Sequence, residues 1–141
     1  MTEKELSIES IKVFKKQFKC SIIRTEKIHG TASHAINGER PDVYGVFWDK
    51  SIIGEIKRSR SDCKHEIKKN HYPVDSMGNY RYIISEIGVL REIDIPESYG
   101  WIEVTEKGYE IKKVAPKREL NDAGKDSERQ LLMMFLRKKA K

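Results

Sequence analysis

The chain has 141 residues, of which 38% are hydrophobic and 35% charged, and its formal net charge at pH 7 is +6. This length favours one domain with a single modest core. No apolar run is long enough to span a bilayer, and the polar N-terminus lacks the pattern of a signal peptide, so neither a membrane protein nor a secreted protein is expected. The two cysteines, Cys20 and Cys63, lie far apart, which favours a reduced, cytoplasmic setting. The positive charge fits a polyanionic partner.

An amphipathic helix is predicted over residues 4–18. Within it Ile8, Ile11, Phe14 and Phe18 follow helical spacing and make one apolar stripe. The lysines of this segment lie mostly off the stripe. We therefore expect the helix to pack on the core and to expose a basic side to solvent.

A short apolar strand is predicted over residues 20–25, and a loop over residues 27–40 follows it. The loop contains His29 and His34. Because no cysteine lies at zinc-finger spacing from this pair, we interpret both as loop or DNA-contacting histidines rather than zinc ligands.

A β-hairpin is predicted from the next segment. Residues 43–48 and 52–56 are rich in β-branched and aromatic side chains, as strands are. Asp49 and Lys50 lie between them and are predicted to form the turn. The pairing of the two strands is then symmetric about these two residues.

This hairpin is predicted to bring three charged side chains together. Symmetric pairing places Asp42 opposite Lys57, with Glu55 as the diagonal neighbour of Asp42. Because side chains alternate along a strand, these three share one face, while the Ile56 side chain points toward a core. Two carboxylates and an ammonium group therefore converge at one end of the hairpin.

A divalent metal fits this group of side chains. Mg²⁺ or Mn²⁺ takes oxygen ligands, and Asp42 and Glu55 supply one oxygen each, with the backbone carbonyl of Ile56 as a third. Such an ion lowers the pKa of a bound water and neutralises charge on a phosphate. Lys57 is then placed to position the water or to stabilise negative charge that develops on a phosphate.

A basic helix is predicted after the hairpin, capped by Ser59 or Ser61 and ending near Asn70. Basic side chains beside a carboxylate cluster are what a phosphate backbone needs for positioning. We therefore predict nucleic-acid contacts for five residues of this region: Arg58, Arg60, Lys64, Lys68 and Lys69.

The second half of the chain is predicted to complete the sheet. Residues 80–85 alternate like a strand, and residues 101–105 and 109–114 are typical of a second hairpin. A polar linker is predicted over residues 116–126. A basic amphipathic helix over residues 127–141 follows.

The terminal helix is predicted to begin with a capping box made by Ser127 and Gln130. Docking on the first helix, binding of a protein partner and self-association remain open for this helix. A role at a membrane is not expected, because the segment is short and the rest of the chain offers no anchor.

The charged cluster resembles a known motif. Pro41-Asp42 followed by Glu55-Ile56-Lys57 resembles the signature of the PD-(D/E)xK nuclease superfamily. Residues 58–62 resemble the Ser-Arg-x-Asp extension of small single-domain members from bacterial DNA repair (MmcB-like) and from phages. Residues 80–84 and 95–102 are similar to the tyrosine-rich strand and the next strand entry of those relatives. The resemblance spans about residues 8–115.

The resemblance implies a restriction-endonuclease-like α/β fold. Its αβββαβ core has a mixed central sheet flanked by helices, and the strand over residues 80–85 lies parallel to the strand that carries Glu55. This chain adds a C-terminal hairpin and a terminal helix to that core. Residues 1–115 then form the nuclease-like domain, and residues 116–141 form the linker and the basic terminal helix.

The resemblance also implies a function and a cellular setting. The function is hydrolysis of phosphodiester bonds in nucleic acid, with DNA favoured, by a magnesium- or manganese-dependent enzyme in the cytoplasm of a bacterial or phage-infected cell. Relatives carry a further carboxylate near Glu26, which is a candidate third metal ligand. A first-helix glutamate also occurs in the superfamily, but Glu5 and Glu9 fall on the polar side of the predicted helix.

Two other readings remain open. A domain of the same fold that binds nucleic acid without catalysis would share every feature except the metal chemistry. A protein-interaction domain would use the acidic and basic side chains only as a surface salt bridge, although such a bridge does not need a second carboxylate beside it.

Overall fold

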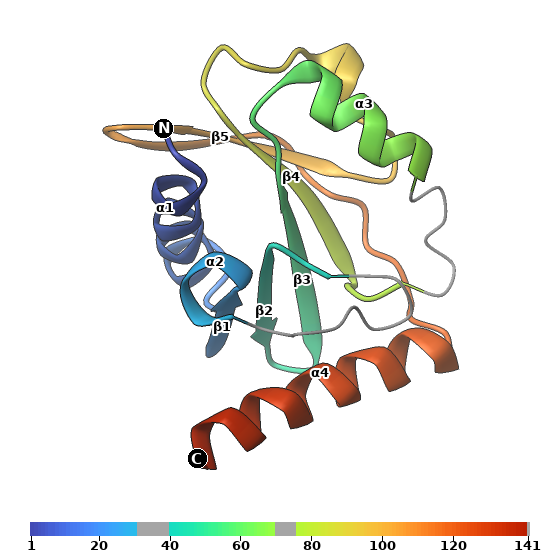
Figure 1. Ribbon diagram of the computed structural model, residues 1–141. Helices are drawn as coiled ribbons and strands as arrows, with labels where there is room; N and C mark the ends of the chain where they lie inside the picture. The colour runs from blue at the N-terminus through green and yellow to red at the C-terminus, as the bar shows by residue number, and fades with distance from the viewer. Residues whose placement is uncertain (31–39, 70–75, 141) are drawn as a thin grey trace.

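The computed structural model describes residues 1–30, 40–69 and 76–140, with side chains for residues 1–30, 40–65 and 76–137 (Figure 1). The described elements follow in this order: α1 (Glu3–Lys16), β1 (Ile22–Thr25), α2 (Glu26–His29), β2 (Val43–Phe47), β3 (Lys50–Ile56), α3 (Arg60–Lys69), β4 (Tyr80–Glu86), the 3-10 helix η2 (Glu92–Asp94), β5 (Gly100–Thr105), β6 (Gly108–Lys113) and α4 (Asp122–Ala140).

The strands form one mixed six-stranded sheet in the order β1-β2-β3-β4-β5-β6. The pairs β3–β4 and β4–β5 are parallel, and the other three are antiparallel. The prediction of a mixed α/β sheet flanked by helices is therefore confirmed, as are the parallel placement of β4 beside β3 and the second hairpin β5–β6. Parallel neighbours require a crossover, and the segment that contains α3 makes it between β3 and β4.

Helices cover both faces of the sheet. On one face α1 contributes Leu6, Val13 and Phe14 to a core shared with the strands. The other face has two smaller cores. One lies under α4 and includes Tyr44, Ile53, Met77 and Leu131, and the other lies between α3 and the strands and includes Cys63, Ile83, Leu90, Ile95 and Trp101.

The side chains of strand β3 point alternately to the two faces of the sheet. Its alternate residues Ile52 and Ile56 point to the α1 side, while Ile53 points to the α4 side. Glu55 shares the parity of Ile53 and therefore lies on the face opposite α1. The charged end of β3 thus belongs to the face that α3 and α4 cover.

The apolar face of helix α1 matches the prediction in part, because Phe14 and Phe18 pack in the core. Its buried hydrophobic residues are Leu6, Val13 and Phe14, whereas Ile8 is 39% exposed. A capping box fixes the start of the helix, because the Thr2 side chain accepts from the backbone N–H of Glu5 and the Glu5 carboxylate accepts from that of Thr2, each at 3.1 Å. The helix consequently begins at Glu3, one residue before the predicted start.

The β2–β3 hairpin turns one residue earlier than predicted. Trp48 and Asp49 form the turn, and the pairs run from Phe47–Lys50 to Val43–Gly54. The predicted pairing of Asp42 with Lys57 is therefore wrong, and the observed register continues to Asp42 opposite Glu55. Because the shift in partner is two residues, the charged side chains stay on one face.

Two glycines let α1 approach this hairpin closely. A Cβ atom on Gly45 would lie 2.8 Å from Cδ2 of Phe14 and 2.7 Å from Sγ of Cys20. A Cβ atom on Gly54 would lie 2.6 Å from Cδ1 of Ile84. The absence of side chains at both positions therefore seats the Phe14 ring directly on the strands.

The terminal helix begins five residues before its predicted start. Helix α4 starts at Asp122, and the Asn121 side-chain oxygen accepts from the backbone N–H of Gly124 at 2.9 Å. The predicted capping box at Ser127 is wrong, since the Ser127 hydroxyl donates to the carbonyl of Ala123 inside the helix. Of the helices within the described ranges, none has the length and hydrophobicity that crossing a bilayer requires.

Candidate functional site

The carboxyl groups of Asp42 and Glu55 meet where β2 begins and β3 ends. Asp42 precedes β2, and its Oδ2 accepts from the backbone N–H of Ile56 at 2.9 Å. The two carboxyl groups lie within hydrogen-bonding reach of each other. Glu55 is 5% exposed and Asp42 is half-buried, so the Glu55 carboxyl is the more shielded from water of the two. Two acids in contact share a proton or a cation, because two bare carboxylates at this range repel each other.

Lys57 stands beside this pair. Its side chain is 3% exposed, and its charge acts to lower the pKa of Asp42. The backbone N–H of Lys57 donates to the carbonyl of Ile84 at 2.9 Å, which fastens the end of β3 to β4. The three residues that the sequence analysis grouped together are therefore neighbours in the fold.

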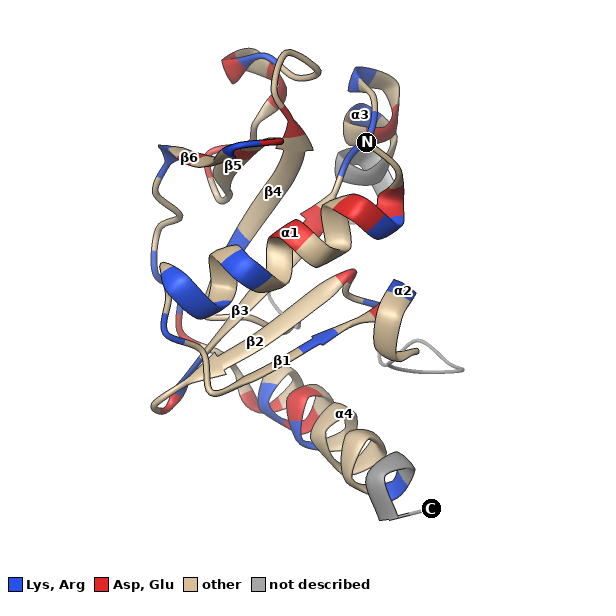
Figure 2. Cartoon of the chain, turned by 90° about the vertical axis from the view of Figure 1, so that its left-hand side faces the viewer, with Lys and Arg blue, Asp and Glu red and all other residues tan. Residues whose placement is uncertain are grey.

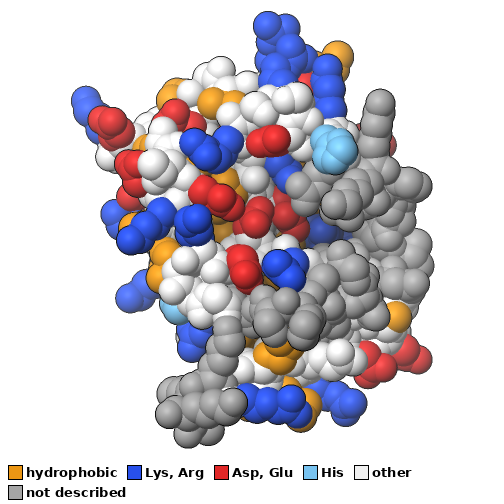
Figure 3. Space-filling model, in the orientation of Figure 1, with side chains coloured by type: hydrophobic (Ala, Val, Ile, Leu, Met, Phe, Trp, Pro, Cys, Tyr) orange, Lys and Arg blue, Asp and Glu red, His pale blue; other side chains and the backbone are white. Residues whose placement is uncertain are grey.

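These side chains line a hollow with a volume of about 260 Å³. Its lining comes from α1, β3, α3 and the segment before β2, and consists of Glu3, Arg40, Asp42, Glu55, Ile56, Lys57, Asp62 and His65. Figure 3 shows acidic side chains gathered near the middle of this face, with basic side chains beside them. The hollow thus combines anionic groups with nearby cations.

Arg81 holds Glu55 from the neighbouring strand. Its guanidinium lies 3.8 Å from the Glu55 carboxylate, and it donates to the carbonyl of Met77 at 2.7 Å and to the Tyr99 hydroxyl at 3.4 Å. Arg81 is 4% exposed. The sequence analysis gave Arg81 no role. An arginine at a core-facing strand position was the available signal, because a buried arginine needs an acidic partner.

The surroundings of Asp42 raise its pKa. Burial is the main cause, because it removes the carboxylate from water, and the nearby Glu3 also acts to raise it. The Ile56 N–H and Lys57 act in the opposite direction without cancelling the effect of burial. The folded chain consequently binds this proton more tightly than the unfolded chain does.

Rising pH is therefore expected to destabilise the metal-free protein through Asp42. The loss of stability develops as the pH rises from the usual pKa of aspartate through the raised pKa of Asp42. In stronger acid, where Asp42 is protonated in both states, this loss is absent. Asp42→Asn keeps an oxygen that accepts from Ile56, and should melt at a higher temperature than wild type above that range. Melting followed by circular dichroism in chelator over a pH series tests this. Asp126→Asn, which changes an exposed residue of α4, is the control. A melting-temperature difference between Asp42→Asn and wild type that does not change with pH would contradict the assignment.

The carboxylates proposed as further ligands are placed differently. Glu26 is the first residue of α2, and its backbone N–H donates to the Asp42 carbonyl at 3.0 Å, but it is not part of the described lining of the hollow. Glu5 belongs to the capping box, and Glu9 pairs with Lys12 at 2.9 Å. Glu3 is the helix residue that lines the hollow. The capping box of Thr2 and Glu5 is the sequence signal that could have identified Glu3, because this box places the start of the helix at Glu3.

The predicted nucleic-acid contacts divide into three groups. Arg58 and Lys64 are exposed. Arg60 makes a two-pronged ion pair with Asp94, Nε–Oδ2 at 2.9 Å and the second terminal nitrogen to Oδ1 at 3.1 Å, which joins α3 to η2. The side chains of Lys68 and Lys69 lie outside the described residues. Of the five, Arg60 thus has a structural partner that the sequence analysis did not foresee.

The two loop histidines are likewise separated. His29 ends α2, and its Nδ1 accepts from the backbone N–H of Thr25 at 3.0 Å. Burial is the main cause that lowers its pKa. His34 lies outside the described residues. His29 therefore closes a single helical turn.

Within the described ranges, no three His, Cys, Asp or Glu side chains converge closely enough to form a metal-binding group. The contact between Asp42 and Glu55 is thus a two-carboxylate arrangement, with Glu3 farther along the same lining. Two carboxylates, a backbone carbonyl and waters are a set that Mg²⁺ uses, because it keeps several of its waters.

Comparisons with known proteins give a fold and no family. No family model and no curated protein matches the chain. Among solved structures, the chain is similar to the SPO1766 protein of unknown function from Silicibacter pomeroyi, with a TM-score of 0.59 and 21% sequence identity over 84% of this chain and 74% of that chain. At this identity the likeness concerns the fold alone, and it supports a mixed α/β architecture shared by the two chains.

Proposed function

We propose that this protein is a metal-dependent nuclease that hydrolyses phosphodiester bonds in nucleic acid, with DNA as the favoured substrate. One observation carries the proposal: the carboxyl groups of half-buried Asp42 and buried Glu55 lie within hydrogen-bonding reach of each other beside the buried Lys57 in one hollow. The cluster contains two acids and two bases, since Glu55 also lies 3.8 Å from Arg81. Interacting ionisable groups gathered in a hollow are frequent at functional sites.

The order of elements supports the finer fold proposal. Helix α1, the strands β1, β2 and β3, helix α3 and strand β4 follow one another as in an αβββαβ core, with the short α2 inserted after β1. The hairpin β5–β6 and helix α4 are then additions to a restriction-endonuclease-like core. Fold alone does not specify chemistry, so the proposal depends on the hollow.

The residues present fit a divalent cation. Oxygens of Asp42 and Glu55 would hold Mg²⁺ or Mn²⁺, and the raised pKa of Asp42 marks a site where added positive charge is favourable. When bound, such an ion supplies a more acidic water and neutralises phosphate charge. Glu3 lies near enough to Asp42 to affect its pKa and adds a further carboxylate to the lining.

The remaining side chains of the hollow have distinct roles in this proposal. Lys57 places a positive charge where negative charge develops on the phosphate, and its burial strengthens that interaction. Arg81 keeps the Glu55 carboxylate oriented from the β4 side. Arg58 and Lys64 are exposed and adjacent in the chain to residues that line the hollow, and in this proposal they contact the phosphate backbone and set its position.

A cleavage assay with matched variants tests the proposal. We expect purified protein to cut labelled single-stranded, double-stranded or branched DNA in Mg²⁺ or Mn²⁺ and not in chelator. Asp42→Asn and Glu55→Gln should each lower the rate at least a hundredfold, on the order expected when a group that stabilises the transition state is lost. Glu97→Gln and Asp126→Asn, exposed acids outside the hollow, should cut like wild type. Equal activity in all four variants would refute the assignment.

A second candidate is a nucleic-acid-binding domain without catalysis. It is favoured by the lack of a three-ligand group among the described residues. Calorimetric titration with Mn²⁺ separates the two. Binding that is lost in Asp42→Asn and Glu55→Gln supports the nuclease, and no binding to the wild type supports the second candidate.

A further inference from the structure

Trp48 lies at an exposed position, where its side chain adds almost no buried apolar surface to the fold. It lies at the tip of the β2–β3 hairpin, it is 94% exposed, and its φ of 53° is in the left-handed region, which a bulky side chain rarely adopts. An exposed aromatic ring on a strained turn costs free energy without burying apolar surface. The ring is therefore free to contact something outside the chain.

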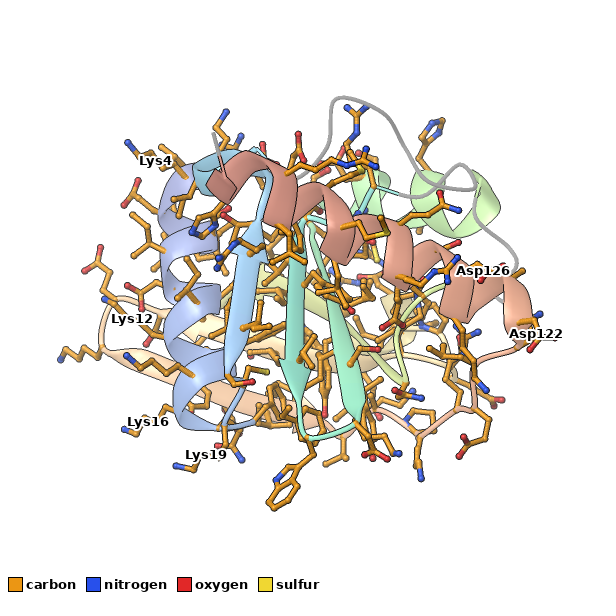
Figure 4. The ribbon with its side chains drawn as sticks, turned by 90° about the horizontal axis from the view of Figure 1, so that it is seen from below. Lys4, Lys12, Lys16, Lys19, Asp122 and Asp126 are labelled. Carbon is orange, nitrogen blue, oxygen red and sulfur yellow. The ribbon has the colours of Figure 1, made fainter. Side chains whose placement is uncertain are left out.

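Exposed lysines follow one side of α1. Figure 4 shows Lys4, Lys12, Lys16 and Lys19 along the same edge of the molecule. All four are exposed, and Lys12 and Lys16 are four residues apart, where side chains are neighbours on the helix surface. Lys4 precedes Lys12 by two turns and lies about 80° from it round the helix axis. Figure 2 shows that basic residues dominate the C-terminal half of this helix. We call Lys4, Lys12, Lys16, Lys19 and Trp48 the α1 track.

The α1 track connects the hollow to the tryptophan. At its N-terminal end, Glu3 of α1 lines the hollow next to Asp42. After the helix, the backbone N–H of Ser21 donates to the carbonyl of Val46 at 2.8 Å, which holds the segment that follows Lys19 against the end of β2 beside Trp48. A helix of this length covers about 20 Å. The track thus runs from the carboxylates at one end of the hairpin to the ring at the other.

We propose that the α1 track binds single-stranded nucleic acid, with the lysines on its phosphates and Trp48 stacked on a base. Proteins that hold single strands combine a line of positive charge with exposed aromatic rings, and stacking tolerates any base. A linear series of lysines fits a phosphate backbone, which repeats its charge at regular intervals. The inference concerns binding and does not require the hollow to cleave, so it is tested in chelator.

Tryptophan fluorescence provides the first test. The chain has two tryptophans, and Trp101 is 6% exposed in the core, so the quenchable emission comes from Trp48. We expect a short oligothymidylate to quench this emission in chelator. Because the Trp48 variants lack this emission, their affinity is measured by the anisotropy of a labelled oligothymidylate. Trp48→Ala should weaken binding about tenfold, in the range that loss of one stacked base gives, while Trp48→Phe stays within about threefold of wild type. Because the side chain is almost fully exposed, both variants should melt like wild type.

The salt dependence of binding provides the second test. Lys16→Gln with Lys19→Gln should reduce the slope of log affinity against log salt by about 1.4, since each phosphate contact on a single strand contributes about 0.7. Lys107→Gln with Lys125→Gln removes the same charge from exposed sites in the β5–β6 turn and α4 and should leave the slope unchanged.

Three results would overturn the proposal. They are equal affinity for wild type and Trp48→Ala, equal slopes for the two double variants, and quenching by anionic phospholipid vesicles but not by the oligonucleotide. The last would assign the tip to a membrane surface. None of these results bears on the cleavage assay, so failure of the α1 track and failure of the nuclease proposal are distinguishable.

Discussion

Replacing Lys57 by methionine is expected to lower the rate of phosphodiester cleavage about a thousandfold, at the upper end of the effect of removing one group that stabilises transition-state charge. Methionine retains the apolar part of the buried side chain, so the packing at the end of β3 should persist. Affinity for nucleic acid should change little, because exposed basic residues supply most of the backbone contacts. Single-turnover rates at saturating substrate measure the chemical step apart from binding.

The same substitution should also change the pH profile. Lys57 acts to lower the pKa of Asp42, so without it that pKa rises further, and the remaining activity should need a higher pH. Lys107→Met, which removes an exposed charge from the β5–β6 turn, is the matched control and should leave both the rate and the profile near wild type. A Lys57→Met rate within about threefold of wild type would remove Lys57 from the catalytic group.

Glu128→Ala is expected to lower the free energy of unfolding by about 4 kcal/mol, because it leaves three donors without their acceptor at roughly 1–3 kcal/mol each. The Glu128 carboxylate accepts from the Tyr44 hydroxyl at 2.7 Å, the Ser51 hydroxyl at 2.8 Å and the backbone N–H of Gly78 at 2.8 Å. Tyr44 and Ser51 are 1% and 2% exposed, so water cannot readily replace the carboxylate. Urea unfolding of the two proteins gives the difference.

Two further variants make this measurement specific. Glu128→Gln keeps one oxygen acceptor and should lose less stability than Glu128→Ala. Gln130→Ala changes an exposed residue of the same helix and should be close to neutral. If Glu128→Ala unfolds at the same urea concentration as Gln130→Ala, helix α4 is not part of the cooperative unit.

The sequence predicted most of the sheet because its strands carry clear local signals. The segments that became β2, β3 and β4 are rich in β-branched and aromatic residues, and the parallel placement of β4 followed from the resemblance. The face shared by Asp42, Glu55 and Lys57 survived the error in register, because the shift moved the partner by two residues. The turn itself was missed, since a left-handed Trp48 goes against the ordinary preferences of turn residues.

The side-chain partners could not be predicted in the same way. The ion pair of Arg60 with Asp94, the contact of Arg81 with Glu55 and the bonds to Glu128 each join segments far apart in the chain. No periodicity within one segment encodes such a pair, because the pairing arises only when the layers pack. Glu3 is different, since the capping box of Thr2 and Glu5 is a local signal that would have placed it in the first turn of the helix, although the sequence analysis did not use it.

The ion pair between Arg60 and Asp94 makes the start of α3 a fixed point of the molecule. The Cys63 thiol also lies 3.5 Å from the Asp94 carbonyl, so the first turn of α3 is fastened to η2 at two places. Asp62, which lines the hollow, lies between these two anchors in the chain. The α3 wall of the hollow is therefore held in place by contacts to η2 that lie outside the hollow itself.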